Sequence, residues 1–150
     1  MKVIYTKVSA DTCRKNRNFY KNHVRRAFII WLSYKNFFDG IFTKKEIKEA
    51  QRGKLPSDCN IHHKMPLSGN ADNNIVNSFA NLVVIHKKTH ERINREIFQP
   101  QLNPIIRAPV GTQIEIDIPE FGYVDRRGII EERAKIKNLL KEYQKRGNKK

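Results

Sequence analysis

Two stretches of the sequence decide the fold: NIHHKMPLSG at residues 60–69 and NLVVIHKKTHERIN at residues 81–94. Together they contain four of the five histidines of the chain, and only His23 lies outside them. Histidine binds metal ions and acts as a base near neutral pH. Such a concentration of imidazole side chains indicates a functional site in this part of the chain.

The predicted order of elements across this window is strand, loop, strand, helix. The tandem histidines close a short strand that begins at residue 60, and the loop after it contains Pro66 and a Ser-Gly-Asn turn. The aliphatic run at 82–85 predicts a second, buried strand. A helix is expected over 87–98, with Pro100 as its stop.

On the predicted helix, His90 and Asn94 are four residues apart, so they share one face and can point at one ion. A hairpin packed against this helix would bring His62 or His63 to the same place. The expected cluster contains two imidazole ligands, an amide oxygen and one spare histidine that can act as a general base on water. Two imidazoles suit Mn, Ni, Zn or Co, and Mg also fits when water completes the coordination sphere.

The window resembles the HNH nuclease motif, the ββα-metal (His-Me) finger of bacteriocin DNases, homing endonucleases and restriction-type nucleases. The tandem histidines and the Pro and Gly/Asn turn after them are similar to the first strand and loop of that motif. Asn81, followed nine positions later by His90, resembles its central Asn and its helical metal ligand. The resemblance implies these roles: metal ligands His62 and His90, general base His63, Asn81 as the residue that orients the His63 loop, and Asn94 at the place of a further ligand.

The resemblance also implies an activity, which is divalent-metal-dependent hydrolysis of phosphodiester bonds with DNA as the expected substrate. One ion of Mg, Mn, Ni or Zn would be the cofactor. The tandem-His form resembles nuclease toxins delivered between bacteria, which implies an acidic immunity protein as partner and action in the cytoplasm of a target cell. A phage or mobile-element nuclease in its own cytoplasm, a ribonuclease with a similar site, a non-catalytic nucleic-acid-binding module and a structural zinc on His86 and His90 are the alternatives.

The charge balance agrees with a polyanionic partner. Thirty Lys and Arg against 15 Asp and Glu give a net charge of +15, which favours nucleic acid first and an anionic membrane second. No apolar run approaches the length of a membrane span and no secretory signal is visible, so we expect no membrane insertion. The window offers these residues for phosphate contact: Lys64, His86, Lys87, Lys88 and Arg92.

The remaining sequence predicts an α+β fold in one domain over 1–150, with a helical support (1–56), the ββα-metal motif (57–99) and a strand plus helix (100–150). A helix with Asp11 as N-cap is expected to run to about residue 36. His23 is expected to be exposed or half-packed on it. The helix has an apolar stripe that includes Phe19, Ala27, Trp31, Val24, Phe28 and Leu32, and a basic face, either solvated or phosphate-tracking, formed by Arg14, Lys15, Arg17, Lys21, Arg25 and Arg26.

The flanking segments leave two further alternatives open. Residues 113–118 alternate polar and apolar side chains and predict a strand whose wet face presents Glu115 and Asp117, a rival metal site or a solubilising pair. Cys13 and Cys59 form one disulfide or stay reduced. The sequence also predicts a short strand at residues 3–7, a capping box at Thr43–Glu46, and a final helix over 127–146 that buries Ile130, Ala134, Ile136, Leu139, Leu140 and Tyr143.

Overall fold

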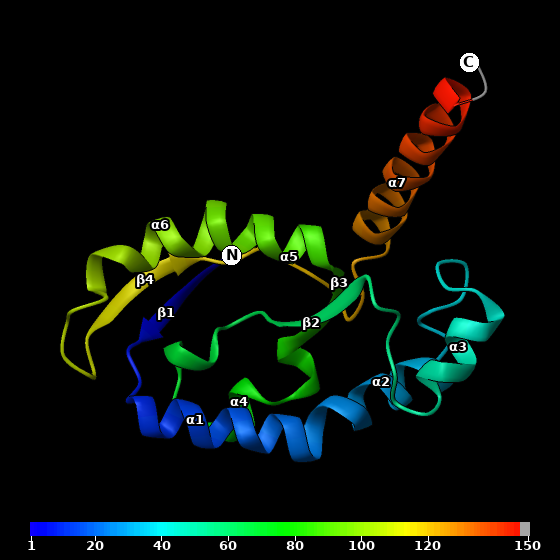
Figure 1. Ribbon diagram of the computed structural model, residues 1–150. Helices are drawn as coiled ribbons and strands as arrows, with labels where there is room; N and C mark the ends of the chain where they lie inside the picture. The colour runs from blue at the N-terminus through cyan, green and yellow to red at the C-terminus, as the bar shows by residue number, and fades with distance from the viewer. Residues whose placement is uncertain (148–150) are drawn as a thin grey trace.

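A computed structural model describes residues 1–147 and has an α+β fold with two separate antiparallel strand pairs (Figure 1). Strand β1 (Lys2–Thr6) pairs with β4 (Gln113–Asp117), and β2 (Cys59–His63) pairs with β3 (Leu82–His86). The N-terminal strand therefore pairs with a strand from the last third of the chain. The sequence also predicts a frayed basic tail at residues 147–150, of which 148–150 lie outside the described residues. Among residues 1–147 there is no helix with the length and apolar character to cross a membrane.

Strand β3 is buried along its whole length and separates two apolar cores. Leu82 and Val84 belong to the core formed with helix α2 (Arg25–Tyr34), whereas Val83 and Ile85 belong to the core formed with helix α5 (Lys87–Ile93) and the β1–β4 sheet. Successive side chains of a strand point to opposite faces, so a strand that is covered on both faces has consecutive apolar residues, here Leu82 to Ile85 before the buried His86. This explains the uninterrupted aliphatic run that predicted it.

The N-terminal helix begins at Ser9 and not at the predicted Asp11. Helix α1 covers Ala10–Phe19, and the Ser9 hydroxyl accepts a hydrogen bond from the Thr12 N–H at 3.1 Å. Ser9 has the extended backbone of a cap residue (φ −63°, ψ 151°), while Asp11 is already inside the first turn, where it pairs with Arg14. The prediction of Asp11 as the N-cap is therefore wrong by two residues.

A π-helical turn, η1 (Tyr20–Val24), joins α1 to α2, so that the long predicted helix is interrupted. Val24, Phe28 and Leu32 are buried as predicted, but Phe19 and Ala27 are exposed, as is His23. A π turn has one residue more than an α turn, so it rotates the residues that precede it relative to those that follow. The apolar stripe therefore does not continue along one face through the whole helix.

Helix α5 does not stop at Pro100. It continues through a second π turn, η4 (Asn94–Phe98), into α6 (Gln99–Leu102) and then η5 (Asn103–Ile105). The Gln99 N–H reaches back five residues to the Asn94 carbonyl. Pro100 then falls in the first turn of α6, where its fixed φ is compatible with the helix and its missing N–H is tolerated. The predicted stop is therefore wrong.

Short elements complete the support and the loop between β2 and β3. Helix α3 (Lys44–Ala50) begins with the predicted capping box, in which Thr43 and Glu46 exchange hydrogen bonds of 2.9 and 3.1 Å. The loop contains η2 (Leu67–Gly69), α4 (Asn73–Val76) and η3 (Phe79–Asn81). Cys13 and Cys59 are both free thiols.

Helix α7 (Arg126–Gly147) projects away from the rest of the molecule (Figure 1). Its buried residues are Ile129 and Glu132, both near its start. The predicted buried face is wrong, because only the first turns of the helix lie against the body of the protein. These predicted core residues are exposed: Ile130, Ala134, Ile136, Leu139, Leu140 and Tyr143.

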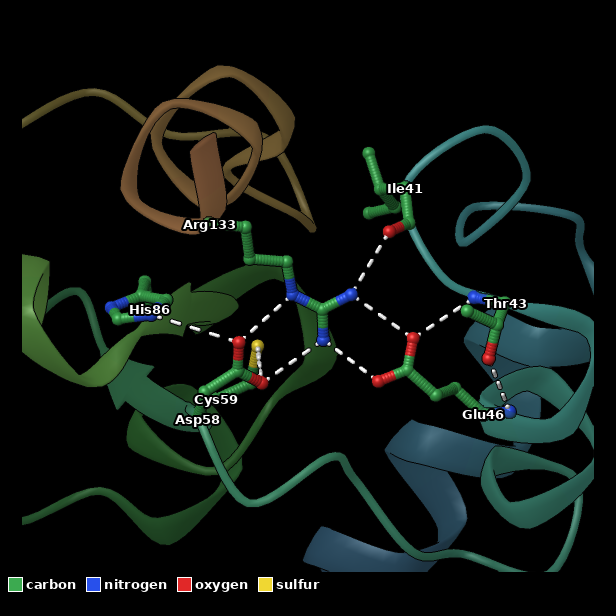
Figure 2. A network of polar contacts seen from close by, with 7 residues as sticks. All are labelled: Ile41, Thr43, Glu46, Asp58, Cys59, His86 and Arg133. Carbon is green, nitrogen blue, oxygen red and sulfur yellow. Dashed lines mark hydrogen bonds and ion pairs between the residues drawn. The ribbon is translucent and has the colours of Figure 1, made fainter. Parts of the chain in front are cut away.

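Arg133, in the first half of α7, links this helix to the rest of the protein by hydrogen bonds and ion pairs (Figure 2). Its guanidinium donates to both carboxylate oxygens of Asp58 at 2.8 and 3.0 Å, and to both of Glu46 at 2.9 and 3.0 Å. It also donates to the Ile41 carbonyl at 3.2 Å. Bidentate pairs of this kind are the strong form of the Arg–carboxylate contact. The network joins α7 to α3 and to the start of β2.

We expect Arg133→Met to destabilise the protein by about 1–3 kcal/mol, because it leaves two half-buried carboxylates without their cation. Burial alone would raise the pKa values of Glu46 and Asp58, but the Arg133 hydrogen bonds and charge outweigh it and lower both. Their contribution is therefore complete above the unfolded-state values of 4.5 and 3.8 and is lost as the pH falls through the lower folded values.

The measurement is urea unfolding of wild type and variant between pH 7 and pH 3. The difference in unfolding free energy should shrink at the acidic end of this range. Arg127→Met is the matched control, because Arg127 is an exposed arginine of the same helix whose one ion pair within residues 1–147 is with the exposed Glu131. A difference between wild type and Arg133→Met that stays constant with pH would contradict the stated cause.

Candidate functional site

The register of the β2–β3 pair sends the tandem histidines to opposite faces. His62 lies opposite Val83, and His63 lies opposite Leu82. Residues directly opposite in an antiparallel pair share a face. His62 therefore faces the core formed with α5, and His63 faces the N-terminal helix. Both side chains nevertheless line one cleft at the end of the strand, together with His90, Asn94 and Arg17.

His62 and His90 come together in this cleft. Their ring centroids are 5.3 Å apart, and the ring of Phe98 lies 5.5 Å from that of His62. The convergence of the hairpin and the helix that the sequence predicted is therefore observed. Asn94 is exposed and lines the same cleft four residues after His90.

The three histidines of the cleft favour the neutral form. Burial, with smaller contributions from His90, His63 and Lys64, lowers the pKa of His62 to about 3. Burial also lowers the pKa of His90, and Glu91 opposes this shift. For His63, burial again lowers the pKa, partly offset by its hydrogen bond to Asn77. A neutral imidazole has one free lone pair, which can bind a metal ion or accept a proton.

The donor set fits a divalent ion that is held by two imidazoles. Nε2 of His62 is buried and has no hydrogen-bond partner, as is also true of Nε2 of His86 and Oγ1 of Thr89, so this nitrogen is available to a ligand. Among residues 1–147, His, Cys, Asp and Glu side chains do not gather in any group of three that could hold a metal. An ion here would therefore complete its coordination sphere with water, substrate oxygens or the Asn94 amide.

The rival metal sites are less suitable. Glu115 and Asp117 are exposed on β4, and Glu115 pairs with Lys2 at 3.5 Å, as expected for a solubilising pair. His86 is only 2% exposed and is the N-cap of α5, which places it at the junction between β3 and α5. Its Nδ1 accepts from the Lys88 N–H at 3.1 Å, and its Nε2 lies 3.6 Å from the Asp58 carboxylate. Nδ1 of His86 is therefore engaged, whereas its buried Nε2 has no hydrogen-bond partner and lies beside the Asp58 carboxylate that Arg133 also contacts.

His63 is enclosed by two residues that the sequence did not single out. Its Nε2 lies 3.0 Å from Oδ1 of Asn77, a buried side chain in the loop between the strands. The ring of Tyr20 lies edge-on to the His63 ring, with centroids 4.6 Å apart. Tyr20 is the first residue of the π turn η1, so this irregular part of the N-terminal helix contacts the candidate base directly.

The Asn81 side chain forms hydrogen bonds with the backbone just after His63. Its Oδ1 accepts from the Met65 N–H at 2.8 Å, and its Nδ2 donates to the Met65 carbonyl at 3.0 Å and to the Val76 carbonyl at 2.8 Å. These bonds join the end of β2 to the segment that contains Asn77. Asn81 therefore contacts the loop that follows His63, and its role in orienting that loop stays a prediction.

The predicted phosphate contacts are mostly engaged elsewhere. His86 is buried, so the expectation that it contacts phosphate is corrected by its position. Lys64 donates to the Ala80 carbonyl at 3.0 Å, and Arg92 pairs with Glu132 at 3.5 Å. Lys87 and Lys88 are exposed at the start of α5. None of these five residues is among those that line the cleft within the described part of the chain.

Arg17 is the basic residue that does line the cleft. It lies on α1, is exposed, and contributes to lowering the pKa of His63 by its charge. The sequence placed it on a basic helical face that was either solvated or phosphate-tracking. Only the packing of α1 against the loop between β2 and β3, which brings Arg17 near His63, 46 positions later, distinguishes Arg17 from the rest of that face.

Comparison with known proteins adds little to this geometry. No family model matches the chain, and no solved structure matches it. A protein of Escherichia coli K12 named "Uncharacterized protein YhhZ" is 27% identical over 93 residues, which are 62% of this chain and 23% of that relative. The chain thus spans less than a quarter of this relative, whose name states no activity.

Proposed function

We propose that this protein is a divalent-metal-dependent endonuclease of the ββα-metal type that hydrolyses phosphodiester bonds, with DNA as the first substrate to test. The observation that carries the proposal is the proximity of His62 and His90, whose ring centroids are 5.3 Å apart, in a cleft that His63 and Arg17 also line. The order β2, β3, α5 around this pair is the order of the HNH motif that the sequence resembles.

Each side chain has a role in this proposal. His62 and His90 would hold the ion, and Asn94 is the further candidate ligand. When bound, a divalent ion supplies Lewis-acid polarisation of the scissile phosphate and stabilises charge on the departing 3′ oxygen. His63 takes a proton from the attacking water, and Asn81 holds the strand end that carries His63.

Arg17 supplies positive charge at the mouth of the cleft. A cation there attracts the phosphate backbone and stabilises charge that develops on the phosphate. The net charge of +15 extends this attraction over the surface. We therefore assign backbone contact to Arg17 in preference to His86, which is buried.

The test of the proposal is nicking of supercoiled plasmid in parallel with digestion of single-stranded and duplex RNA, each with Mg²⁺, Mn²⁺, Ni²⁺ or Zn²⁺. Conversion of the plasmid to open-circle DNA with 5′-phosphate ends supports it. Digestion of RNA alone would favour the ribonuclease alternative. Binding of DNA without cleavage under every metal would favour a non-catalytic module. A role as a delivered toxin with an acidic immunity partner stays a prediction.

We expect Arg17→Ala to lower kcat/KM for plasmid nicking by about 10-fold or more, since it removes one charge-stabilising donor. The slope of log affinity against log salt should also decrease by about 1, as for any lost phosphate contact. Nicking kinetics and fluorescence anisotropy at several salt concentrations measure these two effects. Lys15→Ala on the same helix is the control and should change neither beyond twofold; equal effects of both variants would reduce Arg17 to a general surface charge.

A further inference from the structure

The Asn77 side-chain amide forms one hydrogen bond with His63 and two more with other parts of the protein. The Asn77 side chain is 6% exposed, and its Oδ1 lies 3.0 Å from Nε2 of His63. On its other side, Nδ2 donates to the Asn16 carbonyl at 2.9 Å and to Oδ1 of Asn73 at 2.7 Å. The amide therefore bridges α1, α4 and the end of β2.

The backbone carbonyl of Asn16 beside Nδ2 determines which way the Asn77 amide points. An amide nitrogen only donates and an amide oxygen only accepts. A flipped amide would place Oδ1 against the Asn16 carbonyl, and it would lose this hydrogen bond inside a buried site whichever way the Asn73 amide points. Oδ1 therefore faces His63, and the bond to His63 requires a proton on Nε2.

A neutral imidazole carries one proton, so a proton on Nε2 leaves the lone pair on Nδ1. Within residues 1–147, no protein group hydrogen-bonds Nδ1 of His63, and Nδ1 is not among the buried polar atoms that lack a partner. Nδ1 is thus the ring nitrogen that remains open to solvent or substrate. The edge-on ring of Tyr20, 4.6 Å away, limits the rotation that would exchange the two nitrogens.

We propose that Asn77 is a positioning residue that fixes His63 in its Nε2-protonated tautomer, so that Nδ1 is the atom that accepts the proton of the attacking water. The hydroxide forms a new bond to phosphorus while the bond to the 3′ oxygen breaks. The proton remains on Nδ1 until solvent removes it, and the leaving oxygen takes a proton from solvent. Asn77 keeps its hydrogen bond throughout, because both the neutral ring and the imidazolium carry a proton on Nε2.

The part of this inference that concerns water rests on the proposed function, whereas the tautomer is a property of the folded protein alone. It can therefore be measured without cleavage, by two-dimensional ¹⁵N–¹H correlation of the imidazole groups in the full chain without added metal at one neutral pH. We expect a protonated-type shift for Nε2 of His63 and an unprotonated-type shift for Nδ1. The reverse assignment in the wild-type protein would overturn the inference, whatever the protein cleaves.

Kinetics of three variants test the positioning role. Asn77→Leu should lower kcat for nicking by about 10- to 100-fold, as for other partners that orient a functional histidine, with KM changed by less than twofold. Asn77→Asp retains the oxygen acceptor toward His63 and should restore the Nε2-protonated ring and most of kcat. Its melting temperature should fall, because its second oxygen faces the Asn16 carbonyl. Asn73→Ala is the matched control, because it removes a bond to Asn77 but leaves the contact with His63 in place.

The outcomes separate this inference from the proposed function. Melting temperatures of Asn73→Ala and Asn77→Leu show how much stability each variant loses. If the two losses are similar, only Asn77→Leu should have a lower kcat. A wild-type protein that does not cleave would end the proposed function but leave the tautomer to be read by NMR. A wild type that cleaves, with full kcat in folded Asn77→Leu, would overturn the positioning role alone. If Asn77→Leu does not fold, Asn77→Asp and the wild-type spectrum decide.

Discussion

His63→Ala should lower the rate of plasmid nicking by about 10²–10⁴-fold, which is the usual contribution of a positioned general base. DNA binding should stay within about twofold of wild type, because the neutral ring of His63 contributes no charge to phosphate contact. Burial lowers the pKa of His63, so the wild-type ring remains a competent base at pH values somewhat below 6.5. The wild-type rate should fall only when the pH drops through the lowered pKa of His63.

The measurement is single-turnover nicking at saturating protein, together with DNA binding by anisotropy. His23→Ala is the matched control, since His23 is an exposed histidine outside the cleft, and it should nick at the wild-type rate. Circular dichroism and a melting curve must show that His63→Ala is folded. Wild-type cleavage by the folded variant would remove His63 from the chemistry.

The local part of the candidate site could be predicted from the sequence because it depends on short-range pattern. The period of two in a strand and the spacing of four in a helix are enough to place His62 near His90 once the hairpin meets the helix. The buried run at 82–85 and the capping box at Thr43 are similarly encoded within a few residues. The structure has these elements where the sequence predicted them.

Two groups of errors have the same physical origin, which is packing between segments distant in sequence. Helix α7 has an apolar face of the right period, yet most of it lies away from the body, because periodicity does not say whether a partner surface is present. Arg17 and Asn77 reach the site only through the contact of α1 with the loop before β3. No pattern within either segment predicts that contact.

The π turns explain a further group of errors. The turns at Tyr20–Val24 and Asn94–Phe98 change the phase of the helices that contain them, which moves Phe19 to the surface and lets a helix pass Pro100. Both turns begin at residues near the candidate site, Tyr20 against His63 and Asn94 in the cleft. Such turns occur often at functional sites, but hydrophobic periodicity does not reveal them.

Removal of divalent metal should have an effect as large as loss of the base. Excess EDTA is expected to lower nicking by about 10³-fold or more, because a bound ion contributes several kcal/mol of charge stabilisation and each 1.36 kcal/mol is tenfold in rate. Mn²⁺, Ni²⁺ or Mg²⁺ added beyond the chelator should restore the activity. Undiminished nicking in EDTA after extensive dialysis would contradict a metal-dependent mechanism.

The ligand variants locate the ion. His62→Ala and His90→Ala should each weaken binding of Ni²⁺ or Co²⁺ in calorimetry, while His63→Ala should bind the ion about as tightly as wild type, since its ring is held by Asn77 on the other face of β2. This contrast within a tandem pair is the sharpest test of the assigned roles. Adjacent residues of a strand point in opposite directions, so a site that used both rings as ligands would require the end of β2 to depart from its observed register. Equal loss of metal affinity in all three variants would show that the end of β2 departs from this register. His63 would then be a metal ligand and not the general base.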